Sequence, residues 1–188
     1  MIDNIEALKA ISVHRGSAIV VATMTANFEW PQVSDNPGLD MMFSGAMGKA
    51  SSLGLGLALS QPEKKVIVLD GDGSLLMNLG SLVTIANMAS SNLVHFLFDN
   101  SVYRTTGGQP VPGARKTDFT GFAQAAGYAY AYGFDELEKF KDSLESIMSG
   151  EGPTFVCLKV PQATKRPPYP IVITADIIPR FKKALEKN

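Results

Sequence analysis

The chain alternates between short apolar runs and longer amphipathic stretches. The apolar runs are rich in Val, Ile, Leu and Phe, which is typical of strands buried on both faces of a parallel sheet. The stretches between them carry apolar residues at helical spacing. We predict strands at 18–22, 66–70, 93–98, 128–132 and 154–160, and helices at 5–13, 48–59, 75–89, 118–126 and 134–148. This alternation predicts a doubly wound, mostly parallel α/β sheet with helices on both faces.

Two polar segments and the C-terminal tail interrupt this pattern. Segments 31–40 and 101–117 contain Pro and Gly, and we predict loops there. The 188 residues suffice for one domain of ordinary size, which we place at 1–160. Residues 161–188 begin with a Pro-rich connection and end in a helix predicted at 175–187. This tail is interpreted as a solvated linker to a terminal helix, and the alternative is an arm that lies across a neighbouring subunit.

Composition adds few constraints. The net charge of -1 and an isoelectric point near 6.1 give no sign of the basic surface that binds nucleic acid. Residues 1–6 lack the basic start and apolar core of a signal peptide, and no stretch reaches the roughly 18 apolar residues of a membrane helix. We therefore expect a cytoplasmic protein with no membrane partner. The single cysteine, Cys157, lies within the strand predicted at 154–160 and is expected to be a buried small hydrophobic residue.

Polar residues follow two of the predicted strands. Gly71-Asp72-Gly73-Ser74 follows strand 66–70, and Asp99-Asn100 follows strand 93–98. One helix separates these strands, and the right-handed crossover of a β-α-β unit brings both strand ends to the same edge of the sheet. A carboxylate and a carboxamide suit Mg²⁺, which fills its other positions with water and phosphate oxygens. The glycines let the backbone approach a diphosphate, and Ser74 is predicted to open a helix whose N–H groups favour anions.

Taken alone, Gly71-Asp72-Gly73 is equally typical of an ordinary turn at the end of a strand, because Asp-Gly turns are common. The second motif, at the spacing of one β-α-β unit, changes that balance. The two motifs together favour a metal-diphosphate site.

These motifs resemble those of the thiamine-diphosphate-dependent enzymes, specifically the domain that binds the cofactor's diphosphate. That family has Gly-Asp-Gly, a stretch of about this length and a closing pair such as Asp-Asn, which residues 71–100 match. The Gly-rich stretch 45–56 is similar to the segment that holds the aminopyrimidine ring, and 99–110 is similar to the stretch that follows the metal motif. Over 44–160 the combination is most similar to the decarboxylases of sulfopyruvate and phosphonopyruvate.

The resemblance implies roles for individual residues. It gives Asp72 and Asn100 as side-chain metal ligands, with the main-chain carbonyl of Val102 as a third. Met47 matches the bulky apolar residue that bends the cofactor beneath its thiazolium ring, although an ordinary core methionine is the alternative. Gly45 is implied to accept a hydrogen bond from the aminopyrimidine through its carbonyl. The full set of implied cofactor-binding residues is Gly45, Ala46, Met47, Gly71, Gly73, Ser74, Val102 and Tyr103.

The resemblance also implies that this chain is half of an active site. In the family a glutamate from a different, pyrimidine-binding domain contacts the cofactor, and we find no second α/β repeat here. Sulfopyruvate decarboxylase is often split into two subunits, and 188 residues fit its diphosphate-binding, beta-type subunit. We therefore expect a pyrimidine-binding partner subunit, at least two copies of each chain, and a small 2-oxoacid substrate. The alternatives are a carboligase, a 2-oxoacid oxidoreductase or a non-catalytic cofactor-binding subunit.

Four other charged or titratable residues each have two interpretations. Lys49 and Arg104 are candidates for binding a second substrate anion, although a solvated surface charge is the favoured interpretation of each. His95 falls within the strand predicted at 93–98 and is interpreted as a core histidine rather than a catalytic one. His14 closes the first predicted helix and suits its negative C-terminal end.

Overall fold

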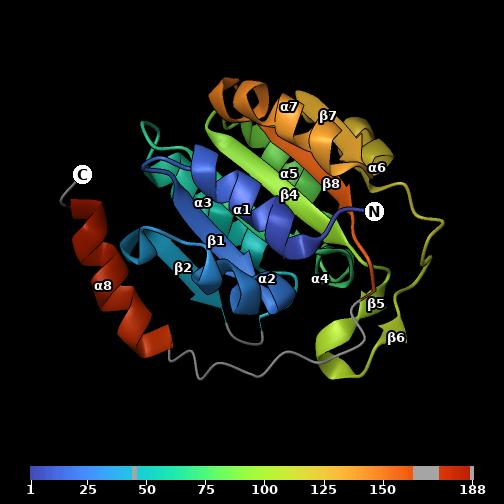
Figure 1. Ribbon diagram of the computed structural model, residues 1–188. Helices are drawn as coiled ribbons and strands as arrows, with labels where there is room; N and C mark the ends of the chain where they lie inside the picture. The colour runs from blue at the N-terminus through green and yellow to red at the C-terminus, as the bar shows by residue number, and fades with distance from the viewer. Residues whose placement is uncertain (44–45, 163–173, 187–188) are drawn as a thin grey trace.

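A six-stranded parallel sheet forms the centre of the molecule in this computed structural model, which describes residues 1–43, 46–162 and 174–186. The strand order is β2-β1-β3-β4-β8-β7, and every neighbouring pair is parallel (Figure 1). The strands are β1 (Ile19–Thr23), β2 (Asp40–Phe43), β3 (Val66–Gly71), β4 (Leu93–Asp99), β7 (Tyr130–Phe134) and β8 (Thr154–Lys159). This topology confirms the predicted doubly wound α/β fold.

Helices cover both faces of the sheet. On one face α1 packs against α7, and on the other α5 packs against both α3 and α6 (Figure 1). The helices are α1 (Asn4–His14), α2 (Met24–Glu29), α3 (Ala50–Ser60), α4 (Asp72–Leu76), α5 (Ser81–Met88), α6 (Phe119–Ala126), α7 (Leu137–Ser149) and α8 (Thr174–Glu186). None of the helices in the described ranges is long and apolar enough to cross a membrane.

Small residues let α3 lie close to the sheet, as its Gly-rich sequence predicts. A Cβ atom at Gly54 would lie 2.3 Å from Cγ2 of Val68 on β3. No side chain fits in that space, so glycine is required at this position although it weakens an isolated helix. The close approach sets the position of the segment before α3, which carries Met47 and Gly48.

Three parts of the predicted secondary structure are wrong. The helix predicted at 75–89 is two helices, α4 and α5, and α4 begins at Asp72 rather than at Ser74. Strand β2 was not predicted, because its four residues begin at Asp40, the last residue of the Pro-containing segment 31–40, and are too few to show a period. Helix α2 was not predicted either. It begins at Met24, whose φ of 51° is in a region that residues other than glycine rarely adopt.

Shorter elements fill the remaining connections. Trp30–Gln32, Pro37–Leu39 and Arg104–Thr106 are single turns of 3₁₀ helix, named η1, η2 and η3. Within the segment predicted as the loop 101–117, β5 (Val102–Tyr103) and β6 (Gln109–Pro110) form a small antiparallel hairpin. This hairpin holds the residues that directly follow Asp99-Asn100.

The C-terminal helix α8 lies beside β2 at the edge of the sheet (Figure 1). It spans Thr174–Glu186, close to the predicted 175–187. Its apolar residues Ile177 and Phe181 are buried and belong to the same core cluster as the sheet residues. The helix therefore shields an edge strand whose backbone groups would otherwise be open to pairing with another chain.

A buried charge cluster fixes the amino ends of β1 and β2. The Arg15 guanidinium lies 3.0 Å from the Asp40 carboxylate, and it donates hydrogen bonds to the Ala18 carbonyl (3.0 Å) and the Ser34 hydroxyl (2.9 Å). The indole of Trp30 lies against the same guanidinium, with its ring centroid 5.4 Å from Cζ. Because the Arg15 side chain is fully buried, its charge depends on these partners.

Removing Asp40 should be costly, since it leaves the Arg15 charge buried without its main counter-ion. We expect Asp40→Ala to lower the free energy of unfolding by about 3–5 kcal/mol in urea titrations. Asp35→Ala is the matched control, because that carboxylate lies 3.8 Å from the same arginine but is 73% exposed. It should cost less than about 1 kcal/mol. Equal effects of the two substitutions would contradict the assigned role of the cluster.

Candidate functional site

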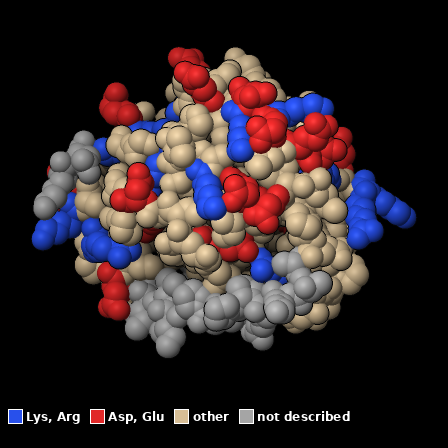
Figure 2. Space-filling model, viewed as in Figure 1, with Lys and Arg blue, Asp and Glu red and all other residues tan. Residues whose placement is uncertain are grey.

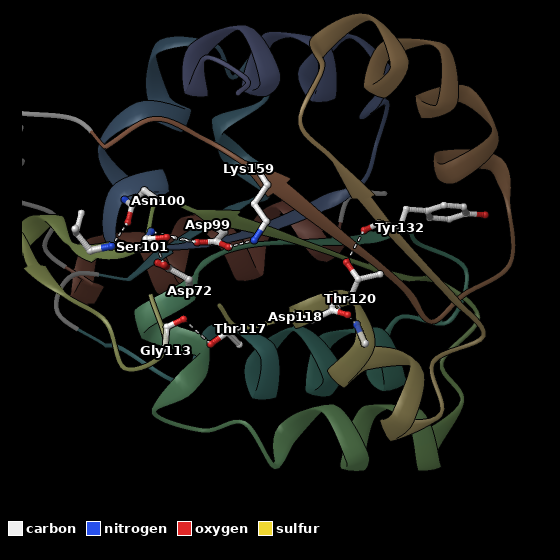
Figure 3. A network of polar contacts seen from close by, with 12 residues as sticks. Asp72, Asp99, Asn100, Ser101, Gly113, Thr117, Asp118, Thr120, Tyr132 and Lys159 are labelled. Carbon is white, nitrogen blue, oxygen red and sulfur yellow. Dashed lines mark hydrogen bonds and ion pairs between the residues drawn. The ribbon is translucent and has the colours of Figure 1, made fainter. Parts of the chain in front are cut away.

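The candidate site lies where β3 and β4 end. The register pairs Gly71 with Phe98, so that Asp72 and Asn100 follow at the same edge of the sheet, as predicted. The main-chain N–H of Ser101 donates a hydrogen bond of 2.7 Å to Oδ2 of Asp72 (Figure 3). This bond ties the loop after β4 directly to the motif after β3.

A cleft opens between these strand ends, α2 and the β5-β6 hairpin. It holds about 290 Å³ of empty space, part of which is open to solvent. Most of the residues that the sequence implicated line it, together with Met24, Thr25, Arg104 and Thr105, which it did not implicate as cofactor-binding. The lining residues are Met24, Thr25, Met47, Gly71, Asp72, Gly73, Ser74, Asn100, Val102, Tyr103, Arg104 and Thr105.

One implicated residue, Ala46, is not among the described residues that line this cleft. The Ala46 carbonyl accepts a hydrogen bond of 3.2 Å from the Thr23 hydroxyl, which joins the segment before α3 to the end of β1. Gly45 lies outside the described residues. The predicted contact between its carbonyl and an aminopyrimidine therefore stays a prediction.

Asp72 is the central acidic group of the cleft. Its side chain is buried, and burial raises its pKa to about 7, with the negative charge of Asp99 acting in the same direction. Hydrogen bonds from the N–H groups of Gly73 and Ser101 act against this increase. At neutral pH the carboxylate is thus ionised only in part, and a nearby cation would favour its charged form.

Asp99 has its own compensating charge. Its carboxylate forms an ion pair with Lys159 at the end of β8, and it accepts hydrogen bonds of 3.1 Å from both the N–H and the hydroxyl of Ser101 (Figure 3). Lys159 is paired with Asp99 and not with Asp72. The second carboxylate, that of Asp72, therefore lacks an equivalent ion pair among the described residues.

The oxygen atoms around Asp72 fit a hard divalent cation. The Asp72 carboxylate, the Asn100 carboxamide and the main-chain carbonyl of Val102 come from adjoining positions at one cleft. Oδ1 of Asn100 accepts a hydrogen bond of 2.9 Å from the Val102 N–H, which fixes the turn between the two. The described residues contain no cluster of three or more His, Cys, Asp and Glu. Mg²⁺ does not need one when phosphate oxygens and water complete its coordination.

The two glycines of the motif are required for different reasons. A Cβ atom at Gly73 would lie 2.4 Å from Cε1 of Tyr103 and 3.0 Å from Cγ1 of Val111, so the fold itself demands glycine there. A Cβ atom at Gly71 would meet nothing within 4 Å. Gly71 thus leaves space at the cleft. Gly73 was predicted to let the backbone approach a diphosphate, but its packing against Tyr103 already requires glycine without any ligand.

Ser74 and Met47 connect the segment before α3 to the cleft. The buried Ser74 hydroxyl accepts a hydrogen bond of 3.0 Å from the Gly48 N–H. Asn78 donates a hydrogen bond of 3.0 Å to the Gly48 carbonyl, so that this glycine is held from both sides. Met47, directly before it, is only partly buried and lines the cleft. Its position differs from that of a methionine enclosed in the core.

Backbone strain borders the cleft. Met24 has a φ of 51° and Ser101 a φ of 63°, and both are positive values that cost free energy in residues other than glycine. Met24 lines the cleft, and Ser101 donates the hydrogen bond to Asp72. Strained residues of this kind concentrate at functional sites, because the surrounding structure must hold them in place.

The interpretation of Arg104 as a solvated surface charge is wrong. Its guanidinium lies 2.6 Å from Oε1 of Glu29, and the two side chains are only 12% and 10% exposed. Oε2 of Glu29 accepts a hydrogen bond of 3.0 Å from the Asn4 carboxamide, which fixes the glutamate. The two paired residues lie 75 positions apart in sequence, so no local sequence pattern predicts the pair.

The other residues with two interpretations lie away from the cleft. Lys49 is exposed, as expected. His95 is fully buried in β4, with its ring 5.1 Å from that of Phe155 and Nε2 3.7 Å from Asp70. A ring nitrogen of His14 lies 3.0 Å from the Ala10 carbonyl in the last turn of α1. Cys157 is buried, as predicted, and burial raises the pKa of its thiol to about 12.

Comparison with known proteins agrees with the fold. Residues 20–158 match the family described as thiamine pyrophosphate enzyme, C-terminal TPP binding domain. The chain is 38% identical to sulfopyruvate decarboxylase subunit beta of Methanothermobacter thermautotrophicus, over 97% of this chain and 95% of that protein. It is 37% identical to phosphonopyruvate decarboxylase of Streptomyces viridochromogenes, over 89% of this chain. The chain spans only 42% of that longer relative.

A solved structure supports the fold alone. Benzoylformate decarboxylase of Polynucleobacter necessarius superposes on 87% of this chain with a TM-score of 0.72 and 19% identity, and the match spans 34% of that enzyme. The sequence relatives and the family match extend the agreement from the fold to the family. The chain therefore belongs to the thiamine pyrophosphate (thiamine diphosphate) enzymes and carries their C-terminal cofactor-binding domain.

Proposed function

We propose that this chain is the Mg²⁺- and diphosphate-binding subunit of a thiamine-diphosphate-dependent decarboxylase for a small 2-oxoacid that carries a sulfonate or phosphonate group. The observation that supports the proposal is the cleft that Asp72, Asn100, Val102 and Met47 line together. The substrate class is supported by the sulfopyruvate and phosphonopyruvate relatives. The near-complete overlap with a subunit beta supports the role of a subunit.

Different residues of the cleft would bind different parts of the cofactor and its metal ion. Asp72, Asn100 and the Val102 carbonyl would hold Mg²⁺, and the main-chain N–H groups of Gly73 and Ser74 would meet the diphosphate. Met47 would support the thiazolium ring. When bound, the cofactor supplies an electron sink for the loss of CO₂, and the protein orients its ends and excludes water.

One functional group has to come from elsewhere. The described residues that line the cleft include no glutamate, and Glu29 nearby is held by Arg104 and Asn4. The cleft is also small for a whole cofactor, which agrees with a site completed by a second surface. We propose that a pyrimidine-binding partner subunit supplies the glutamate, with at least two copies of each chain in the assembly.

Removing the Asp72 carboxylate should abolish metal-dependent cofactor binding. In calorimetric titrations of thiamine diphosphate with Mg²⁺, we expect Asp72→Asn to raise the Kd at least about 100-fold, because it removes the anionic ligand. EDTA should have the same effect on the unaltered protein. Asp142→Asn on the exposed face of α7 is the matched control and should leave the Kd unchanged. Equal affinities of the Asp72 variant and the unaltered protein, alone or with the partner, would refute the assignment.

The raised pKa of Asp72 makes a prediction about the metal-free protein. An unfolded aspartate has a pKa of about 3.9, so the folded protein holds this proton more tightly. Its contribution to stability is complete below pH 4 and is lost as the pH rises through about 7. Asp72→Asn should therefore stabilise the metal-free chain relative to the unaltered one more at pH 8 than at pH 5, by on the order of 2 kcal/mol. Urea unfolding measures this difference, and a pH-independent difference would show that the Asp72 pKa is ordinary.

Reconstitution tests the reaction. We expect no turnover from this chain alone, and release of CO₂ with formation of an aldehyde once the pyrimidine-domain protein of the adjacent reading frame is added with Mg²⁺ and cofactor. Reduction of an electron carrier would instead identify an oxidoreductase, and a condensed product would identify a carboligase. Cofactor binding without any turnover in the complex would identify a non-catalytic subunit. As an internal control, Met47→Ala should slow turnover without weakening the metal site, and Met47→Leu should restore most of the rate.

A further inference from the structure

We propose that Arg104 binds the second acid group of the substrate, the sulfonate or phosphonate that remains after CO₂ is lost. The inference rests on the proposed function, because it concerns a 2-oxoacid that carries such a group. A sulfonate or phosphonate is charged at neutral pH, and burying it without a cationic partner costs free energy. A site for this substrate therefore needs a positive side chain inside the cleft.

Arg104 is that side chain. Of the described residues that line the cleft, it is the one with a positive charge. It lies on the same cleft as Asp72 and Met47, which mark the metal and thiazolium ends of the proposed cofactor position. A guanidinium offers several N–H donors in one plane and matches the oxygens of a sulfonate or phosphonate.

The surroundings of Arg104 hold it in place before any ligand arrives. Glu29 lies 2.6 Å from one guanidinium nitrogen, and the Asn4 carboxamide fixes the other oxygen of Glu29. Glu29 comes from α2 and Asn4 from α1, whereas Arg104 begins η3 after the hairpin strand β5. A fixed guanidinium loses little conformational entropy on binding an anion, which favours affinity and orientation.

Other basic residues near the strand ends are less suitable. Lys159 does not line this cleft and instead lines a separate one together with Arg115. Lys49 is exposed and does not line the cleft. On the face seen in Figure 2, basic and acidic side chains lie interspersed. In its described part, this face therefore has no broad positive surface that could attract the substrate anion in place of a contact with one side chain.

The test uses the reconstituted complex with Mg²⁺ and cofactor. We expect Arg104→Gln to lower kcat/KM about 10- to 100-fold for sulfopyruvate and phosphonopyruvate, chiefly through KM, and less than threefold for pyruvate, which lacks the second acid. Arg104→Lys should lose less than Arg104→Gln, because it keeps the charge but not the planar donors. Arg115→Gln is the matched control on an exposed arginine outside the cleft, and it should change neither substrate.

Binding of unreactive substrate analogues tests the role of Arg104 independently of turnover. Sulfoacetate and phosphonoacetate, which have the second acid but no oxo group, should bind the cofactor-loaded complex and bind at least tenfold more weakly to the Arg104→Gln variant. Equal losses for pyruvate and sulfopyruvate would show that Arg104 only holds the hairpin against α2. A tenfold rise in the Kd of thiamine diphosphate would show that it contacts the cofactor instead. Either result overturns the assignment, whereas a complex that decarboxylates no 2-oxoacid overturns the proposed reaction.

Discussion

Parallel pairing of β3 with β4 is the constraint on which the candidate site depends. Because Gly71 lies opposite Phe98, the two chain segments leave the sheet at the same level, and the Ser101 N–H reaches the Asp72 carboxylate. A slip of one residue would move one strand by about 3.3 Å and turn its side chains to the other face. The carboxylate and the carboxamide would then no longer share a cleft. Register, set by two apolar runs, thus determines the geometry of a polar site.

The fold treats its two neighbouring carboxylates unequally. Asp99 is neutralised by Lys159 and accepts two hydrogen bonds from Ser101, so that it holds the loop after β4 in a backbone conformation with positive φ. Asp72 is buried beside it without such a cation, and its pKa is raised. One carboxylate therefore serves structure, and the other remains available for a metal. Across the cleft a carboxylate again has a structural role, because Glu29, which does not line the cleft, holds Arg104, which does.

Much of this could be read from the sequence, because the controlling signals are local. Apolar runs predicted the strands of the sheet other than β2, and the rule for β-α-β crossovers placed Asp72 and Asn100 together. The pairings of Arg104 with Glu29 and of Lys159 with Asp99 join positions 75 and 60 apart, and only the folded chain reveals them. Helix α2 escaped prediction for a related reason, since the φ of Met24 is imposed by its surroundings and not by its own preference.

The two glycines of the Gly-Asp-Gly motif have different evolutionary prospects. Gly73 is enclosed by Tyr103 and Val111, so a descendant of this chain that no longer used a cofactor would still need glycine there to fold. Gly71 faces open space, and a side chain at that position would narrow the cleft while leaving the core intact. In such a lineage Gly71 is free to change first. Among distant relatives, the first glycine therefore carries more information about cofactor use than the second.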